Sequence, residues 1–287
     1  MLTGRRNPPK QTISLRRLSL RRLTALHNLQ RIRAAVRETA AGDGEMQILD
    51  PELWNEKKKI LVILAHPDDP EFFCGGSIAR WTQAGHQVEY CLLTRGDKGV
   101  SDGVAVDPEQ LKQRRTIEQR EAAAVLGVQR VQFLEYEDGF LQAGVEERKA
   151  VVRVLRSVRP DIVVTCDPTS YYVRDVRINH SDHRAAGQIV LDAVFPACDN
   201  PMFFPELLDE GLQPHKVEEL WILLNSAGNT PLDVTNQWEL RIEAILKHAS
   251  QVPDVPKFLA NQRSRHTADS TLENPRYIDQ FRRIKFQ

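Results

Sequence analysis

The sequence predicts an α/β fold in which a mostly parallel β-sheet is covered by helices on both faces, as a three-layer sandwich. Two observations lead to this prediction. From residue 57 onward, short apolar runs alternate with segments of helical length, which is the pattern of consecutive βαβ units. The first and fourth of these runs are also apolar at nearly every position, as strands are when both faces of a parallel sheet are covered.

Five strands and five helices are expected in alternation. The predicted strands cover residues 58–65, 87–94, 131–136, 161–166 and 216–225. The predicted helices cover residues 71–85, 108–126, 146–158, 182–195 and 235–251. Gly85 closes the first helix and Pro160 follows the end of the third, as these residue types do at helix ends. The expected strand order is 3-2-1-4-5, which places the first and fourth strands side by side where the order reverses.

A basic N-terminal extension precedes this alternation. Residues 1–45 hold ten Lys and Arg but only three Asp and Glu, with Leu and Arg repeated at helical spacing. A surface-binding amphipathic helix, an organelle transit peptide and a solvated arm all fit this composition. Met46 could instead be the true translation start, in which case the extension is not part of the native product.

The remaining chain, residues 46–287, is expected to form the folded domain. Its core spans about residues 57–251. Residues 196–214 and 252–287 are rich in Pro, Asn and Asp, and we expect irregular loops and a tail there.

Composition excludes several classes of protein. The 287 residues are 41% hydrophobic and 27% charged, and the formal net charge is zero, so no basic field favours nucleic acid. No run approaches the roughly 20 apolar residues of a membrane span. The four cysteines have no C-x-x-C spacing, which argues against a thiolate metal site and fits a reducing cytoplasm. We expect a cytoplasmic protein without nucleic-acid partner or membrane span, and a homo-oligomer stays open.

A first cluster of ionisable residues follows the first predicted strand. His66 stands at the end of the strand, and Asp68, Asp69 and Glu71 follow within five residues. Sheets of this type bind ligands at the carboxyl ends of their strands, and carboxylates packed there repel one another unless a cation lies between them. A helix N-terminus that attracts acids explains Asp69 and Glu71 but not His66. Imidazole with carboxylate suits zinc.

A dinucleotide is excluded at this turn. The G-x-G-x-x-G pattern, which lets backbone approach a pyrophosphate, is absent. The turn is acidic, and its glycines, Gly75 and Gly76, fall inside the predicted helix.

A second cluster follows the fourth predicted strand. His180 and His183 flank Asp182 where a helix begins. With strands one and four as neighbours, both clusters open into one crevice. His66, Asp69 and His183 would then form a site of two histidines and a carboxylate with an open position for water, which is the pattern of catalytic zinc.

These two motifs resemble those of the LmbE-like (PIG-L) zinc deacetylases. The signature of that family is A-H-P-D-D-x-E after the first strand and H-x-D-H later, and the matching residues here are Ala65 to Glu71 and His180 to His183. Further similar segments are residues 94–99, 115–127, 138–139, 159–168 and 244–251. The resemblance implies a Rossmann-like fold and hydrolysis of an N-acetyl group, usually from a glucosamine-containing substrate.

The resemblance also implies roles for the metal ligands and their neighbours. His66, Asp69 and His183 would bind one zinc ion per chain. Asp68 would be the general base that takes a proton from water. His180 would stabilise the oxyanion or protonate the leaving amine.

Three further residues receive roles around these. Asp182 would orient the imidazole of His180. Arg115 and Asp138 match positions that contact the sugar. In each case a simpler interpretation exists, Arg115 as a surface charge and Asp138 as a turn residue.

One position departs from the family pattern. Some members carry Tyr two residues before the first His of H-x-D-H, where this chain has Ile178. Tyr171 or Tyr172 could substitute. His248 and Gln251 fit a family H-x-S-Q pattern without an assigned role.

Two other functions stay open from the sequence. One is a zinc amidase that cleaves a larger amide or a thiol conjugate with the same machinery. The other is a non-catalytic sugar-binding protein, which is disfavoured because such a protein needs neither Asp68 nor His180.

Overall fold

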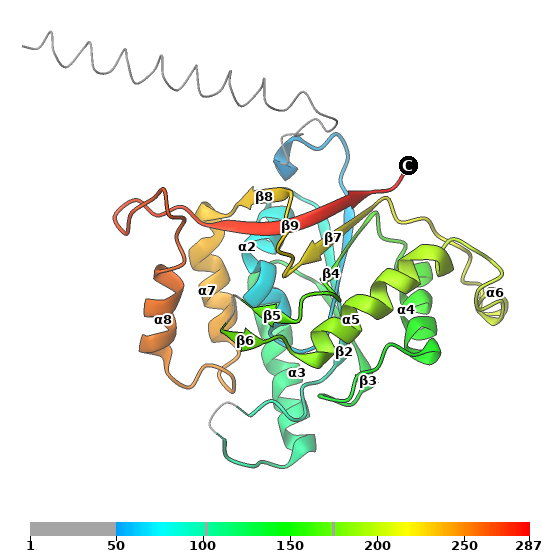
Figure 1. Ribbon diagram of the computed structural model, residues 1–287, viewed down its shortest axis with the longest axis horizontal. Helices are drawn as coiled ribbons and strands as arrows, with labels where there is room; N and C mark the ends of the chain where they lie inside the picture. Colours follow the sequence, from blue (N-terminus) through cyan, green and yellow to red (C-terminus); the bar gives the residue numbers. More distant parts are fainter. Residues whose placement is uncertain (1–49, 101–102, 174–175) are drawn as a thin grey trace, which may run out of the picture. The chain divides into compact units, whose positions relative to one another are not determined.

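A seven-stranded sheet forms the middle layer in the computed structural model, which describes residues 50–100, 103–173 and 176–287 (Figure 1). In spatial order the strands are β3 (Arg130–Tyr136), β2 (Gln87–Thr94), β1 (Lys59–Leu64), β4 (Ile162–Cys166), β7 (Glu219–Leu223), β9 (Ile278–Lys285) and β8 (Thr230–Asp233). The predicted extension at 1–45 and the alternative start Met46 lie outside the described residues.

The predicted fold class is confirmed. The five predicted strands correspond to β1, β2, β3, β4 and β7, which pair in parallel in the order 3-2-1-4-5. β1 is the central strand of this parallel part: its Ile60 pairs with Val88 of β2 on one side and with Ile162 of β4 on the other. The carboxyl ends of β1 and β4 therefore meet at the same edge of the sheet.

The expectation of an irregular tail at 252–287 is wrong. This segment contains α8 (Val255–Arg263) and β9, and β9 pairs antiparallel with both β7 and β8. Its charged residues hide the strand in the sequence, because Asp279 is buried there and accepts hydrogen bonds from the backbone N and Oγ of Ser77 at 2.8 and 2.7 Å. Residues 196–214 are mostly irregular, as expected, apart from the short helix α6 (Glu206–Asp209).

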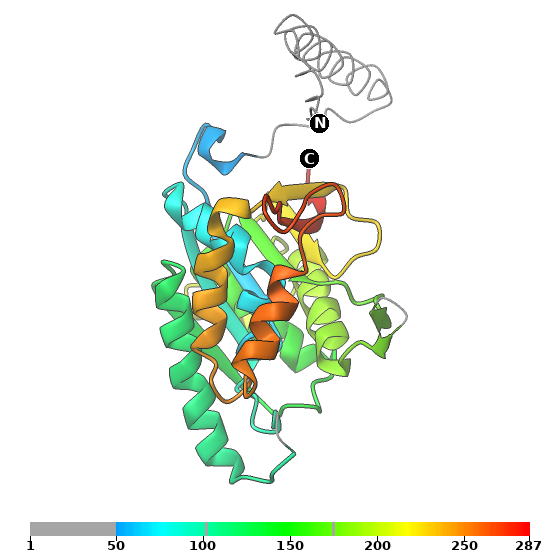
Figure 2. The same cartoon turned by 90° about the vertical axis from the view of Figure 1, so that its left-hand side faces the viewer.

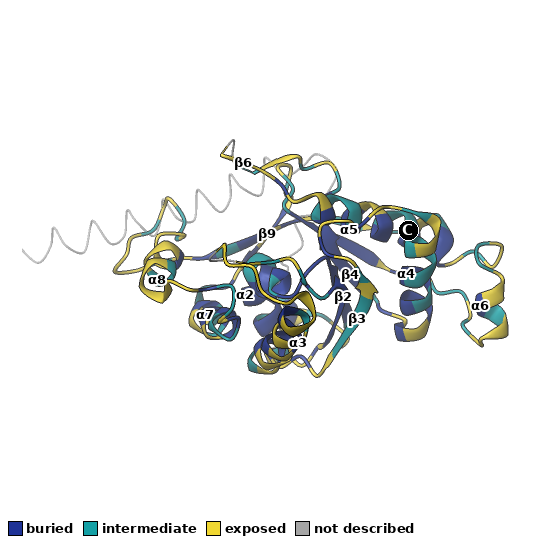
Figure 3. Ribbon diagram, turned by 90° about the horizontal axis from the view of Figure 1, so that it is seen from below, coloured by how far each residue is buried: buried dark blue, intermediate teal, exposed yellow. Residues whose placement is uncertain are grey.

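Helices cover both faces of the sheet. The helices α2 (Asp69–Gln83), α3 (Pro108–Val125) and α7 (Trp238–Leu246) pack on one face, and α4 (Val145–Val158) and α5 (Ser181–Asp192) pack on the other. Figure 2 shows α2, α3, α7 and α8 together from their own side. In Figure 3 the central strands are buried while the helices are exposed on their outward sides. None of the helices in the described ranges is long and apolar enough to cross a membrane.

The apolar character of β1 follows from this arrangement. Ile60, Val62 and Leu64 belong to the core under α2, α3 and α7, whereas Leu61 and Ile63 belong to the core under α4 and α5. Successive side chains of a strand point to opposite faces, so a strand covered on both sides is apolar throughout. The tryptophans Trp81, Trp221 and Trp238 are also buried in the first of these cores.

Close packing sets the position of α5 relative to β4. A Cβ atom added to Gly187 would lie 2.4 Å from the backbone oxygen of Cys166, the last residue of β4. Only glycine permits this approach. The first turn of α5, which carries His183, is thereby held beside the carboxyl end of the parallel strands.

Candidate metal and catalytic site

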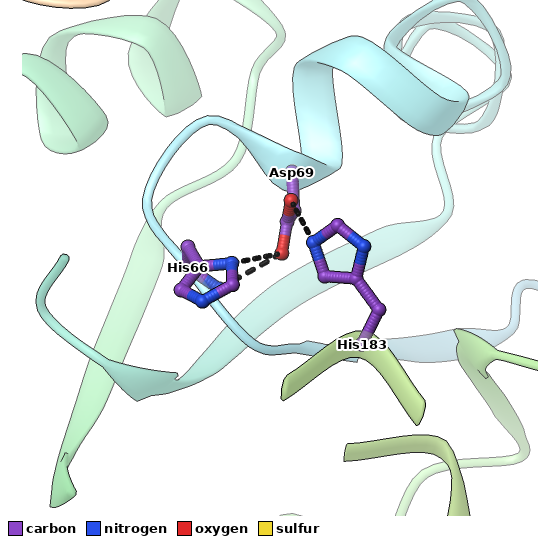
Figure 4. Close-up of side chains that lie close together, drawn as sticks. All are labelled: His66, Asp69 and His183. Atoms are coloured by element: carbon purple, nitrogen blue, oxygen red, sulfur yellow. Dashed lines mark hydrogen bonds and ion pairs between the residues drawn. The ribbon is translucent and has the colours of Figure 1, made fainter. Parts of the chain in front are cut away.

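The two sequence motifs meet at the carboxyl end of β1. His66 follows the strand, Asp69 opens α2 and His183 lies in the first turn of α5. Ligand atoms of these three side chains lie within 4.8 Å of one another. Asp69 Oδ2 is 3.3 Å from His66 Nδ1, and Asp69 Oδ1 is 3.1 Å from His183 Nε2. Figure 4 shows the carboxylate of Asp69 between the two imidazole rings.

The β1–α2 turn fixes Asp69 with its own backbone. The N–H of His66 donates to Asp69 Oδ2 at 2.8 Å. Asp68, between them, has φ 90° and ψ −31°, a conformation that residues other than glycine rarely adopt. The two side chains have different partners: Asp68 Oδ2 lies 3.3 Å from Arg115 Nη2, whereas Asp69 contacts His66 and His183.

His183 is oriented by Asn179, a residue that the sequence reasoning missed. Asn179 Nδ2 donates to the backbone oxygen of Ser170 at 2.8 Å, so Asn179 Oδ1 is left to face His183 Nδ1 at 3.0 Å. The amide oxygen can only accept, so Nδ1 carries the proton of the neutral ring. His183 Nε2 then presents a lone pair toward Asp69.

Two carboxylates orient His66, so that one of its ring nitrogens also faces Asp69 with a lone pair. His66 Nε2 lies 3.2 Å from Asp138 Oδ1 and 3.3 Å from Asp182 Oδ2. Because carboxylate oxygens accept hydrogen bonds, Nε2 carries the proton of the neutral ring and Nδ1 presents its lone pair to Asp69. A carboxylate behind a ligating histidine is the usual support in metal sites.

These residues fit a divalent metal ion. Two imidazole nitrogens and the carboxylate of Asp69 converge within contact distance, and a cation between such electron-rich atoms would offset their repulsion. Two nitrogen ligands and one oxygen ligand also match the donors of catalytic zinc. The site therefore fits the ion that the sequence predicted.

The carboxylates around the site differ in their affinity for a proton. Burial alone would raise the pKa of Asp69, but His183 and His66 outweigh it and hold that pKa well below its usual range. Burial is likewise outweighed at Asp138, where the hydrogen bond from His66 lowers the pKa to about 2. For Asp68, burial raises the pKa and Arg115 offsets it only in part. Asp68 is thus the carboxylate of this group that accepts a proton most readily.

His180 lies beside His66 and His183, the two histidines that contact Asp69. Its ring centre is 4.6 Å from that of His66 and 5.4 Å from that of His183. The backbone N–H of Asp182 donates to His180 Nδ1 at 3.2 Å, so the neutral ring carries its proton on Nε2. Burial, and then the two neighbouring imidazoles, lower the pKa of His180. Its side chain is 45% exposed and so can reach a substrate.

The carboxylate of Asp182, which was expected to orient His180, lies closer to His66. Its carboxylate lies 4.0 Å from His180 Nδ1 but 3.3 Å from His66 Nε2, and its Oδ2 accepts from the N–H of Gly139 at 2.7 Å. The backbone N–H of Asp182 orients His180, while its carboxylate supports His66. The sequence could not distinguish these because both groups belong to one residue.

Arg115 is buried inside the site. It is 3% exposed and donates to the backbone oxygens of Gly96 and Pro67 at 3.0 and 2.6 Å, with Asp68 Oδ2 at 3.3 Å. A Cβ atom at Gly96 or Gly99 would lie 2.2 or 2.1 Å from Arg115 Nη1. The glycines of residues 94–99 thus make room for this guanidinium.

Asp138 is buried at the site, whereas Tyr171 and Tyr172 are exposed. Asp138 is 4% exposed and, besides its contact with His66, accepts from the N–H of Lys98 at 3.1 Å. Its contacts are thus with the site itself. Tyr171 and Tyr172, considered as substitutes at Ile178, are 56% and 71% exposed on the hairpin of β5 (Tyr172–Val173) and β6 (Arg177–Ile178), and the ring of Tyr171 packs under Arg184.

Comparison with known proteins agrees with this geometry. Residues 61–194 match the family model "PIG-L: GlcNAc-PI de-N-acetylase". A diacetylchitobiose deacetylase of Thermococcus kodakarensis is 36% identical over 203 residues, which cover 71% of this chain and 73% of the relative. The chain belongs to the PIG-L family. The resemblance seen in the sequence is thereby confirmed.

Two further proteins extend the comparison. The 1D-myo-inositol 2-acetamido-2-deoxy-α-D-glucopyranoside deacetylase of Rhodococcus erythropolis is 28% identical over 243 residues, covering 69% of this chain and 83% of that protein. The structure of N,N'-diacetylchitobiose deacetylase from Pyrococcus horikoshii superposes with a TM-score of 0.73 at 30% identity, covering 84% of this chain and 88% of the other. The likeness to PIG-L proteins thus extends from sequence to tertiary structure.

Proposed function

We propose that this protein is a zinc-dependent hydrolase that removes the acetyl group from an N-acetylglucosamine-type substrate. The observation that carries the proposal is the convergence of His66 Nδ1, His183 Nε2 and the Asp69 carboxylate. The names of the relatives support the substrate class, since diacetylchitobiose and the inositol glycoside both carry an acetamido group.

The metal would be held by His66, Asp69 and His183. When bound, zinc supplies a Lewis acid for the acetyl carbonyl and makes a water molecule acidic enough to lose its proton near neutral pH. Three orienting contacts, from Asn179 to His183 and from Asp138 and Asp182 to His66, would keep the two imidazole nitrogens directed at one point.

Asp68 is placed to move the proton. It is adjacent to Asp69 in the chain, and its side chain is 16% exposed, so the carboxylate is accessible from the site. Arg115 Nη2 at 3.3 Å holds one carboxylate oxygen. In this position Asp68 would take the proton of the attacking water and pass it to the departing amine.

His180 would act on the carbonyl oxygen of the reacting amide. Because its Nδ1 accepts from the backbone N–H of Asp182, its Nε2–H is available to donate. A fixed donor directed at the developing oxyanion stabilises the transition state more than the ground state.

The test is release of free amine from a panel of substrates by the purified protein. The panel contains N-acetylglucosamine, N,N'-diacetylchitobiose, a glucosaminyl-inositol, a larger N-acyl amide and a thiol conjugate. We expect amine from the N-acetyl sugars, loss of turnover after chelation, and recovery when zinc returns.

Two results would contradict the proposal. Full turnover after chelation would show that the reaction needs no metal. Turnover of the larger amide or the thiol conjugate alone would favour an amidase. Asp68→Asn, in which zinc should stay bound, is expected to slow turnover by roughly 10²–10⁴-fold. Sugar binding without any turnover would indicate a binding protein.

A further inference from the structure

Asp68 is held in its unusual conformation by groups on both sides of its backbone. A non-glycine residue at φ 90° persists only where its surroundings determine it. The oxygen of Asp68 accepts from the N–H of Phe72 at 3.0 Å, as α2 begins. Its N–H donates to Oε1 of Gln119 at 2.7 Å. A side chain of another helix, α3, therefore completes the turn.

The amide of Gln119 is itself fixed in one orientation. Its Nε2 donates to both carboxylate oxygens of Glu71, at 3.0 and 3.1 Å. Because a carboxylate can only accept, the NH₂ group faces Glu71 and the oxygen faces Asp68. Gln119 and Glu71 are both 0% exposed, so water does not compete for these bonds.

His248 completes this buried group from a distant part of the chain. Its Nε2 lies 3.1 Å from Glu71 Oε2, and the side chain is 0% exposed. His248 Nδ1 has no hydrogen-bond partner among the described residues, so in the neutral ring the proton on Nε2 serves Glu71. Residues of α2, α3 and the end of α7 thus fix one amide.

α3 presents two residues to Asp68 from one face. Arg115 and Gln119 stand four positions apart, which places them on the same side of the helix. Arg115 holds the carboxylate of Asp68 at 3.3 Å, and Gln119 holds its backbone N–H at 2.7 Å. The two contacts fix both ends of the residue that would move the proton.

We propose that Gln119 is a positioning residue for proton transfer by Asp68, with Glu71 and His248 fixing its amide. The inference rests on the proposed function, because it assigns a purpose to the geometry of the base. The side-chain hydrogen bonds of Gln119 go to Asp68 and Glu71, which are not among the proposed metal ligands. Its effect should fall on kcat, because a displacement of about 1 Å in a reacting group can cost about 10²-fold.

The first test is Gln119→Leu, which removes both hydrogen-bonding groups at similar volume. We expect kcat to fall by about 10²-fold, with KM and zinc content unchanged. The matched control is Gln113→Leu on the exposed side of the same helix, where the side chain of Gln113 donates to Glu109 at 3.3 Å. Loss of zinc in Gln119→Leu, or wild-type kcat, would overturn the positioning role.

Because Gln119→Leu leaves buried groups unpaired and could fail to fold, a charge swap provides a second test. Gln119→Glu alone places two carboxylates against each other and should lower kcat. Adding Glu71→Gln restores a donor facing an acceptor, while Glu at 119 still accepts from the Asp68 N–H. Recovery of kcat in the double variant is expected, and a further fall would overturn the proposal.

A double-mutant cycle separates positioning from general support of the fold. In an Asp68→Asn background, Gln119→Leu should cost little more, because groups that act through one another are not additive. An undiminished further loss of about 10²-fold would show that Gln119 acts independently of Asp68. If the unaltered chain and Gln113→Leu release no amine, the proposed function itself fails and this inference with it.

Discussion

The β1–α2 and β4–α5 junctions both supply residues to the site, but they reach it by different routes. Four residues separate β1 from α2, whereas fourteen separate β4 from α5 and include the β5–β6 hairpin. In the first junction, Asp69 is fixed by the backbone N–H of His66. In the second, His183 is fixed by the side-chain amide of Asn179.

This difference separates two tasks. The short junction holds the buried His66 and the strained Asp68, while the long one leads to His183 and holds the half-exposed His180. The backbone of Asn179 links two ends of the long junction. Its N–H donates to the backbone oxygen of Tyr171 at 2.8 Å, and its backbone oxygen accepts from Arg184 Nη1 at 2.6 Å. A backbone N–H thus fixes the side chain of Asp69 at the short junction, whereas the side-chain amide of Asn179 fixes His183 at the long one.

The largest effect is expected when one ligand is removed from each junction. His66→Ala with His183→Ala should abolish zinc binding and turnover, because only Asp69 of the three ligands stays. Elemental analysis of the purified variant measures the metal, with His215→Ala as the control, since His215 bonds to the backbone of Pro160. Full zinc content in the double variant would remove the ligand assignment.

The next effect distinguishes the two histidines of the long junction. His180→Ala should keep zinc and lose kcat by about 10²–10³-fold, the scale of one oxyanion donor. His183→Ala should instead lose zinc. Zinc content and kcat are measured for both variants side by side, and the opposite pattern would exchange the two roles.

A smaller effect tests the amide that fixes the long junction. Asn179→Ala should weaken zinc binding by about 10–100-fold, as loss of a residue that orients a ligand does. Competition with a chelator measures the affinity, and Asn261→Ala, at an exposed position of α8, is the control. Unchanged affinity would mean that the packing of α5 on β4 suffices to orient His183.

No effect on either junction is expected when residues 1–45 are removed. The sheet begins at Lys59 and the first site residue is His66. We expect kcat/KM for the preferred substrate and the melting temperature of the chain from Met46 to equal those of the full chain. An inactive or unstable product would show that the extension contributes to the domain.

The sequence predicted the parallel strands and the cluster of His66 with Asp69 because both patterns are local in the chain. β1 is apolar at every position after Lys59, and His66 and Asp69 belong to one turn. β9 was missed because its inward residue Asp279 is charged, and the Ser77 groups that satisfy it lie 202 positions away. Such a partner is visible only in the folded chain.

The residues that orient the site also differ in how far along the chain their partners lie. Asn179 stands four positions before His183, the spacing of contacts across a helix start, and this was a usable signal. Gln119 was part of a family-like segment, but its partners Asp68 and Glu71 lie about fifty residues earlier. Asp182 was assigned to the nearer histidine in the chain, whereas its carboxylate lies closer to His66.

The position of β9 has a consequence for how the protein is synthesised. This strand leaves the ribosome after both β7 and β8, yet it lies between them in the sheet. β7 is completed about sixty residues before β9, which corresponds to roughly 3–12 s of elongation. During that interval the buried strand β7 presents an unpaired edge, which is a site of aggregation. A stop codon before Ile278 would make this exposure permanent, so that prematurely terminated chains should accumulate in the insoluble fraction.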